Sequence, residues 1–94
     1  MFARKRSFLI KVSSKTNPKK LALALYHAME ESNGDDVIAQ AIGVRAVNQL
    51  VKGVAIARGM AAPKGYKIAV EPFFADLVTE SGTVSGIRMR IIAC

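Results

Sequence analysis

The side chains of this chain that could take part in chemistry are mainly cations, and they are placed unevenly. Residues 1–29 hold seven Lys or Arg and no acid, whereas residues 30–94 hold seven of each sign, so the net charge of +7 comes entirely from the N-terminal third. A one-sided basic balance indicates a polyanionic partner, nucleic acid first and a membrane surface second. From charge alone, the alternative is a solvated face that only aids solubility.

Patterns typical of catalysis or metal binding do not occur in the sequence. His27 has no Ser, Cys or carboxylate at a motif spacing, so we interpret it as a surface or boundary residue rather than a general base. The pairs Glu30–Glu31 and Asp35–Asp36 are interpreted as a solvated turn rather than a metal site. Cys94, the single cysteine, can form neither a disulfide within the chain nor a Cys/His cluster. We therefore expect no enzyme, no metal, no cofactor and no small-molecule substrate.

The cellular compartment follows from three further observations. One cysteine suits a reducing compartment. No apolar run approaches the roughly 20 residues of a membrane span. The basic start at residues 1–6 is not followed by the apolar region of a signal peptide. We expect a cytoplasmic protein that does not bind membranes.

The hydrophobic pattern predicts the elements that must position the cations. Asn17 followed by Pro18 is a typical helix start, because Asn caps the first turn and Pro is tolerated at its first position. Gly34 can take the left-handed conformation that ends a helix. We expect strands at residues 8–12, 37–42, 66–78 and 87–93, helices at residues 17–34 and 45–58, and a polar hairpin loop at residues 79–86.

The order βαβαββ predicts an α/β fold of the two-layer α+β type, with a four-stranded mixed sheet and both helices on one face. The first two strands should run parallel as neighbours, joined by a right-handed crossover, and the last two should form an antiparallel hairpin. We expect one domain at residues 8–94. The basic arm at residues 1–7 is either a disordered tail or a contributor to binding.

The second predicted helix has two distinct faces. Its apolar arc is expected to pack on the sheet. The opposite arc is polar but includes Ile56, which suggests contact with another chain. Gly43 precedes the helix, so the free N–H groups of the first turn can approach an anion closely. The apolar arc consists of Ala46, Val47, Leu50, Val51, Val54 and Ala57, and the polar arc of Arg45, Asn48, Gln49 and Lys52.

Three segments of the chain resemble the bacterial stage V sporulation protein S family. They are residues 11–15 (KVSSK), residues 39–43 (AQAIG) and residues 46–59 (AVNQLVKGVAIARG), of which the last is the most specific. The resemblance extends over about residues 8–93. This family is similar in fold to Alba, the archaeal chromatin protein that binds DNA and RNA as a dimer. The resemblance therefore implies an Alba-like fold and a link to bacterial sporulation or developmental control.

The resemblance also implies where nucleic acid would bind. Alba's contacts map to Arg45, to Lys15 and its neighbours, and to the hairpin at residues 79–86. The chain departs from the Alba pattern at Thr16 and Asn17, which replace two lysines, in the hairpin, which carries Glu80 and no cation, and at the extra residue Val44. A second function class, a protein–protein regulator without nucleic-acid affinity, therefore stays open.

Two sets of site residues complete the expectation. The loops that follow parallel strands lie at the same end of a sheet, so the cations after the first strand should meet the start of the second helix. A homodimer is expected because one sheet face and two short helices cannot cover all the apolar side chains. The alternative for the paired phenylalanines is stacking on bases. The nucleic-acid interface is predicted at Lys15, Asn17, Lys19, Lys20, Gly43, Arg45, Asn48 and Lys52, and the dimer interface at Ile56, Phe73, Phe74 and Ile91.

Overall fold

A computed structural model describes residues 7–32 and 36–94 of the chain. The basic side chains of the expected N-terminal arm and the predicted helix end at Gly34 lie outside the described residues. No helix in the described part of the chain is long and apolar enough to cross a membrane. Within residues 7–32 and 36–94, the elements are β1 (Ser7–Val12), α1 (Pro18–Ser32), β2 (Asp36–Ala41), α2 (Val44–Ala61), the short 3-10 helix η1 (Ala62–Lys64), β3 (Ile68–Thr79) and β4 (Gly82–Ala93).

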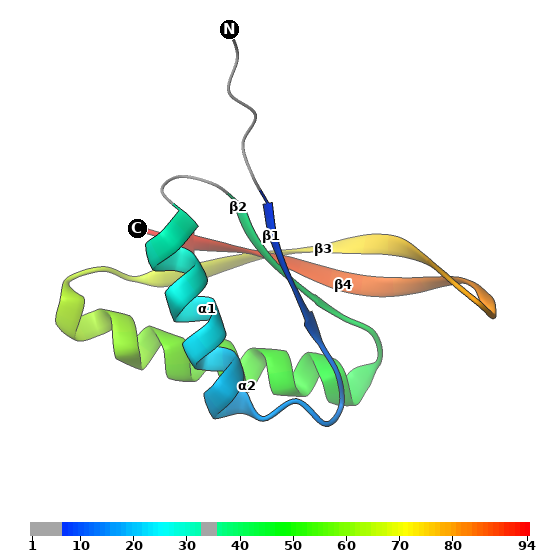
Figure 1. The fold of residues 1–94 in the computed structure, drawn as a ribbon, viewed down its shortest axis with the longest axis horizontal. Coiled ribbons are helices and arrows are strands. Elements are labelled where there is room, and N and C mark those ends of the chain that lie inside the picture. The colour runs from blue at the N-terminus through cyan, green and yellow to red at the C-terminus, as the bar shows by residue number, and fades with distance from the viewer. Residues whose placement is uncertain (1–6, 33–35) are drawn as a thin grey trace, which may run out of the picture.

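The four strands form one mixed sheet in the order β1-β2-β4-β3. β1 and β2 are parallel neighbours, and the pairs β2/β4 and β3/β4 are antiparallel. Both helices lie on one face of this sheet (Figure 1). The predicted two-layer α+β fold is therefore confirmed.

The second helix ends later than the sequence indicated. The predicted end at residue 58, just before Gly59, is wrong, because α2 continues through Ala61 and leads into η1. The residue that leaves helical geometry is Gly65, with a φ of 86° in the left-handed region. A glycine inside a helix lowers helix propensity but does not by itself end the helix.

The hairpin is also longer than expected. The prediction of a loop over residues 79–86 is wrong, because β4 begins at Gly82 and pairs with β3 up to the cross-strand pair Thr79–Gly82. The tight turn is held by the Thr79 hydroxyl, which donates to the Gly82 carbonyl (2.8 Å) and accepts from the Ser81 N–H (3.2 Å). This part of the hairpin extends beyond the helices (Figure 1), so both of its faces meet solvent and its strands are polar like a loop.

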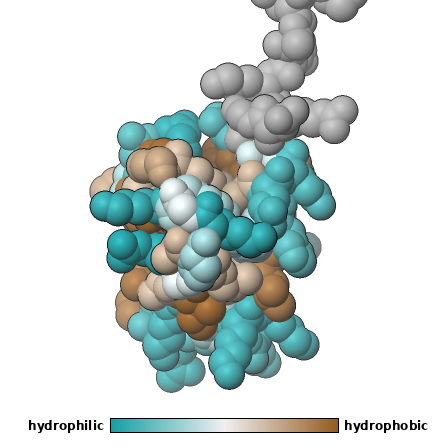
Figure 2. Space-filling view, turned by 90° about the vertical axis from the view of Figure 1, so that its left-hand side faces the viewer, coloured by the Kyte–Doolittle hydropathy of each residue, from teal (hydrophilic) through white to brown (hydrophobic). Residues whose placement is uncertain are grey.

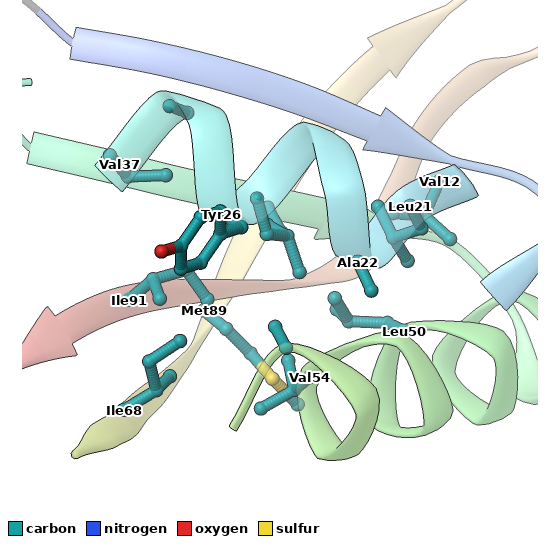
Figure 3. Close-up of a cluster of buried hydrophobic side chains, with 14 of the residues drawn as sticks. Val12, Leu21, Ala22, Tyr26, Val37, Leu50, Val54, Ile68, Met89 and Ile91 are labelled. Atoms are coloured by element: carbon teal, nitrogen blue, oxygen red, sulfur yellow. The ribbon is translucent and has the colours of Figure 1, made fainter. Parts of the chain in front are cut away.

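The core lies between the helices and the sheet. Leu25 of α1 and Leu50 of α2 are fully buried, and they belong to one cluster of buried side chains with Val37, Met89 and Ile91 of the sheet (Figure 3).

Gly53 of α2 faces Leu21 of α1 at the helix crossing. A Cβ atom on Gly53 would lie 2.6 Å from Leu21 Cδ2, so the absence of a side chain lets the helices approach closely. The predicted apolar arc of α2 included Val51 and is wrong there, because Val51 is 51% exposed. The arc is instead centred on the Gly53 side, where α1 covers the helix.

Candidate nucleic-acid interface

The loop after β1 is an ordered turn. Thr16 Oγ1 accepts from the Ser13 N–H (2.8 Å), and the Thr16 N–H donates to the Ser13 carbonyl (3.1 Å). The Lys15 N–H donates to Ser13 Oγ (3.2 Å). The two bonds that involve a hydroxyl are local side-chain-to-backbone bonds of the kind that Ser and Thr make in turns. They fix the backbone of Lys15 and leave its side chain exposed.

Asn17 caps the first helix, as the sequence predicted. Its Oδ1 accepts from the N–H groups of Lys19 (2.9 Å) and Lys20 (3.2 Å), which satisfies two donors at the start of α1. Both lysine side chains are exposed. Asn17 therefore acts on the site by holding Lys19 and Lys20 in the first turn, with its own carboxamide oxygen already engaged.

Gln49 ties the loop to the second helix. Its Nε2 donates to the carbonyl of Thr16 (2.9 Å), across 33 residues of sequence. The sequence placed Gln49 only on the polar arc, and nothing in its spacing indicated a partner. Because this bond joins α2 to the turn that carries Lys15, Gln49 is a positioning residue that sequence reasoning missed.

Lys19 and Lys52 line one open hollow between the two helices. Its volume is about 500 Å³, and Asn17, Pro18, Ala55 and Ile56 complete its lining. The structure thus brings together the start of α1 and the polar face of α2, as the sequence predicted. Asn48 is also exposed on this side of α2, and its amide lies 3.4 Å from Gln49 Oε1.

Gly43 and Arg45 lie at the start of α2, before Lys52 in the chain. Gly43 is the residue before α2, with a φ of 90° that suits glycine, and no side-chain hydrogen bond caps the helix start. Arg45 is exposed in the first turn. It lies seven residues before Lys52, which is about 10 Å along the helix axis. The uncapped N–H groups and the helix dipole favour an anion beside this guanidinium.

Most cations of the described residues have no carboxylate partner. In residues 7–32 and 36–94, the only ion pairs are those of Arg90 with Asp36 (3.9 Å) and with Glu71. The five cations predicted for the interface therefore have no carboxylate partner in that part of the chain. No group of three His, Cys, Asp or Glu that could hold a metal occurs among the described residues. The cations at issue are Lys15, Lys19, Lys20, Arg45 and Lys52.

The predicted dimer residues do not all share one surface. Ile56 is 37% exposed on α2 and Phe74 is 81% exposed on β3, so both are available to a partner. Phe73 is half-buried on the opposite face of the sheet, since successive residues of a strand alternate. Ile91 is only 5% exposed in the core, and its assignment to an interface is wrong.

One apolar residue of this surface was missed. Val78 is 88% exposed and lies four positions after Phe74, so the two share one face of β3. Val78 is the last residue of the strand predicted at residues 66–78, so alternation along that strand could have placed it on the same face as Phe74. Apolar side chains also reach the surface between polar ones at the end where α2 finishes (Figure 2).

Comparison with solved structures shows the fold. Alba from Thermoplasma volcanium is similar to this chain with a TM-score of 0.58, at 21% sequence identity, over 90% of this chain and 96% of that one. The Alba-like architecture expected from the sequence is thereby confirmed. The model of the stage V sporulation protein S family matches residues 8–94, so the chain belongs to that family.

Proposed function

We propose that this protein is a small regulatory or architectural nucleic-acid-binding protein that holds the phosphate backbone as a homodimer. The observation that carries the proposal is that Lys19 of α1 and Lys52 of α2 line one hollow and that neither has a carboxylate partner among the described residues. Family membership supports a role in sporulation.

Two anchor points for phosphates follow from the geometry. Lys19 and Lys52 face one hollow from two helices and can neutralise one phosphate together. Arg45 and the uncapped start of α2 can hold another. Contacts of this kind position a protein on nucleic acid and carry little base information.

The hairpin has a different role in this proposal. Residues 72–87 contain no Lys or Arg and two acids, Asp76 and Glu80, so the arm is unsuited to a phosphate backbone. Its exposed Phe74 and Val78 suit apolar contact with a second copy through a two-fold interface, whereas Ile56 of α2 lines the hollow of Lys19 and Lys52.

The test is an anisotropy titration against duplex DNA, single-stranded DNA and RNA at several salt concentrations. About four neutralised phosphates should give a slope of log K against log salt near −3 to −4 on duplex DNA. An absence of binding to all three at low salt would overturn the proposal.

The second candidate is a protein–protein regulator on the same fold. The exposed apolar side chains of the acidic hairpin favour it, because Phe74 and Val78 would bind a different protein as readily as a second copy. It takes over if the protein binds no nucleic acid.

A further inference from the structure

The sheet face opposite the helices carries a row of four side chains that run straight across the strands. Lys11 of β1 pairs with Gln40 of β2, Gln40 pairs with Arg88 of β4, and Arg88 pairs with Phe73 of β3. Strands lie about 4.8 Å apart, so the row spans about 14 Å. The two helices cover the other face (Figure 1), so this row faces outward.

Arg88 is held in the row by a neutral partner. Its Nε donates to Oε1 of Gln40 (2.9 Å), and Gln40 is only 9% exposed. Arg90, two residues further along β4, is instead paired with the carboxylates of Asp36 and Glu71. Among the described residues Arg88 has no ion pair, so its guanidinium is fixed in place with its charge uncompensated.

The surface next to Arg88 is hollow and partly apolar. Lys11, Gln40 and Arg88 line a hollow of about 380 Å³ whose apolar walls include Leu9, Ile42 and Leu77. Gly86 makes room for two of these walls, because a Cβ there would lie 2.8 Å from Leu77 Cδ1 and 3.2 Å from Ile42 Cγ1. The site therefore combines a fixed cation, Arg88, and an exposed one, Lys11, with the apolar walls of a hollow.

This hollow is continuous with the loop that carries Lys15. A neighbouring hollow of about 400 Å³ shares Lys11, Gln40 and Ile42 with it and adds Ser13 and Ser14. A nucleic-acid strand bound at the end of β1 could thus pass around the edge of the sheet onto the face that the helices do not cover.

We propose that this open face binds an unpaired stretch of nucleic acid, with phosphates at Lys11 and Arg88 and a base or sugar against the apolar walls. Single strands are bound by cationic grooves with exposed apolar or aromatic surface, whereas a duplex keeps its bases stacked. Phe73 at the end of the row is half-buried, and the Arg90 guanidinium carbon lies over its ring, 5.6 Å from the centroid. The site is separate from the patch of Arg45, Lys19 and Lys52, so a variant can lose binding at one of the two sites and keep it at the other.

The test compares binding of a fluorescent single-stranded 12-mer and of the matching duplex. Arg88→Gln and Lys11→Gln should each weaken single-strand binding about fivefold and flatten its salt slope by about 0.7, while duplex binding is unchanged. Arg58→Gln, which removes the same charge from an exposed position of α2, is the control. It should change the affinity for the single strand and for the duplex only slightly.

A second measurement protects the test against misfolded variants. In the NMR spectrum of the wild-type protein, the Arg88 Nε–H and the Gln40 side-chain amide should shift on titration with the single strand and not with the duplex. The proposal is overturned if these NMR signals do not shift, or if Arg88→Gln binds the single strand as Arg58→Gln does. It is also overturned if polyglutamate displaces the labelled strand as effectively as unlabelled strand of the same total charge.

Discussion

Replacing Gly53 by Ala tests how closely the two helices must approach. The new Cβ would lie 2.6 Å from Leu21 Cδ2 and 2.8 Å from Leu21 Cγ, and Leu21 is buried, so the crossing must open. Overpacking of this kind costs about 1–3 kcal/mol, which outweighs the gain of about 1 kcal/mol from replacing a helical Gly by Ala. We expect a net loss of up to about 2 kcal/mol.

Gly59 supplies the matched control on the same helix. It is exposed, and a Cβ there would meet no atom within 4 Å, so Gly59→Ala should gain about 0.5–1 kcal/mol. Thermal unfolding followed by circular dichroism, at one protein concentration, should place the two variants on opposite sides of the wild type, about 10 °C apart. If both variants are stabilised alike, the tight crossing is not a feature of the protein.

The remaining predictions concern the loop, the dimer and pH. Gln49→Ala should weaken duplex binding a few-fold at an unchanged salt slope, since it frees the turn of Lys15 without removing charge; a flattened slope in the anisotropy titration would contradict this. Phe74→Asp should give a monomer by sedimentation where the wild type is a dimer, whereas Ala69→Asp on the other sheet face should not, and a monomeric wild type would refute the interface. Burial, and to a smaller extent the neighbouring Tyr26, raises the pKa of Tyr66 above its ordinary value of 10.0. The folded state therefore holds the phenolic proton of Tyr66 more tightly than the unfolded state does. The free energy of unfolding of the wild type should therefore decline as pH rises above 10. The free energy of unfolding of the Tyr66→Phe variant should decline less over the same range.

Local chemistry made much of the fold predictable. The Asn17 cap, the strand at residues 8–12 and most of the apolar arc of α2 depend on residues close in sequence, and they appear in the structure. Features that depend on distant partners were missed. Gln49 has a role only because the turn at Thr16 lies beside it, and Val51 is exposed only because α1 covers the Gly53 side.

The misassigned hairpin has the same cause. Residues 82–86 are polar and rich in glycine, like a loop, but they pair with β3 in an arm that no helix covers. Ile91 was assigned to an interface from its apolar character, yet its register opposite Val37 places it in the core. Polarity alone does not distinguish a solvated strand from a loop, or an interface residue from a core residue.

The most direct test of nucleic-acid binding is the salt dependence of duplex affinity for the wild type and for Arg45→Ala. The account predicts a wild-type slope near −3 to −4 and, for the variant, weaker binding to all sequences with a slope flatter by about one. A variant that binds with the wild-type affinity and slope would remove Arg45 from the interface. A wild-type protein that binds no duplex, single strand or RNA at low salt would contradict the function itself.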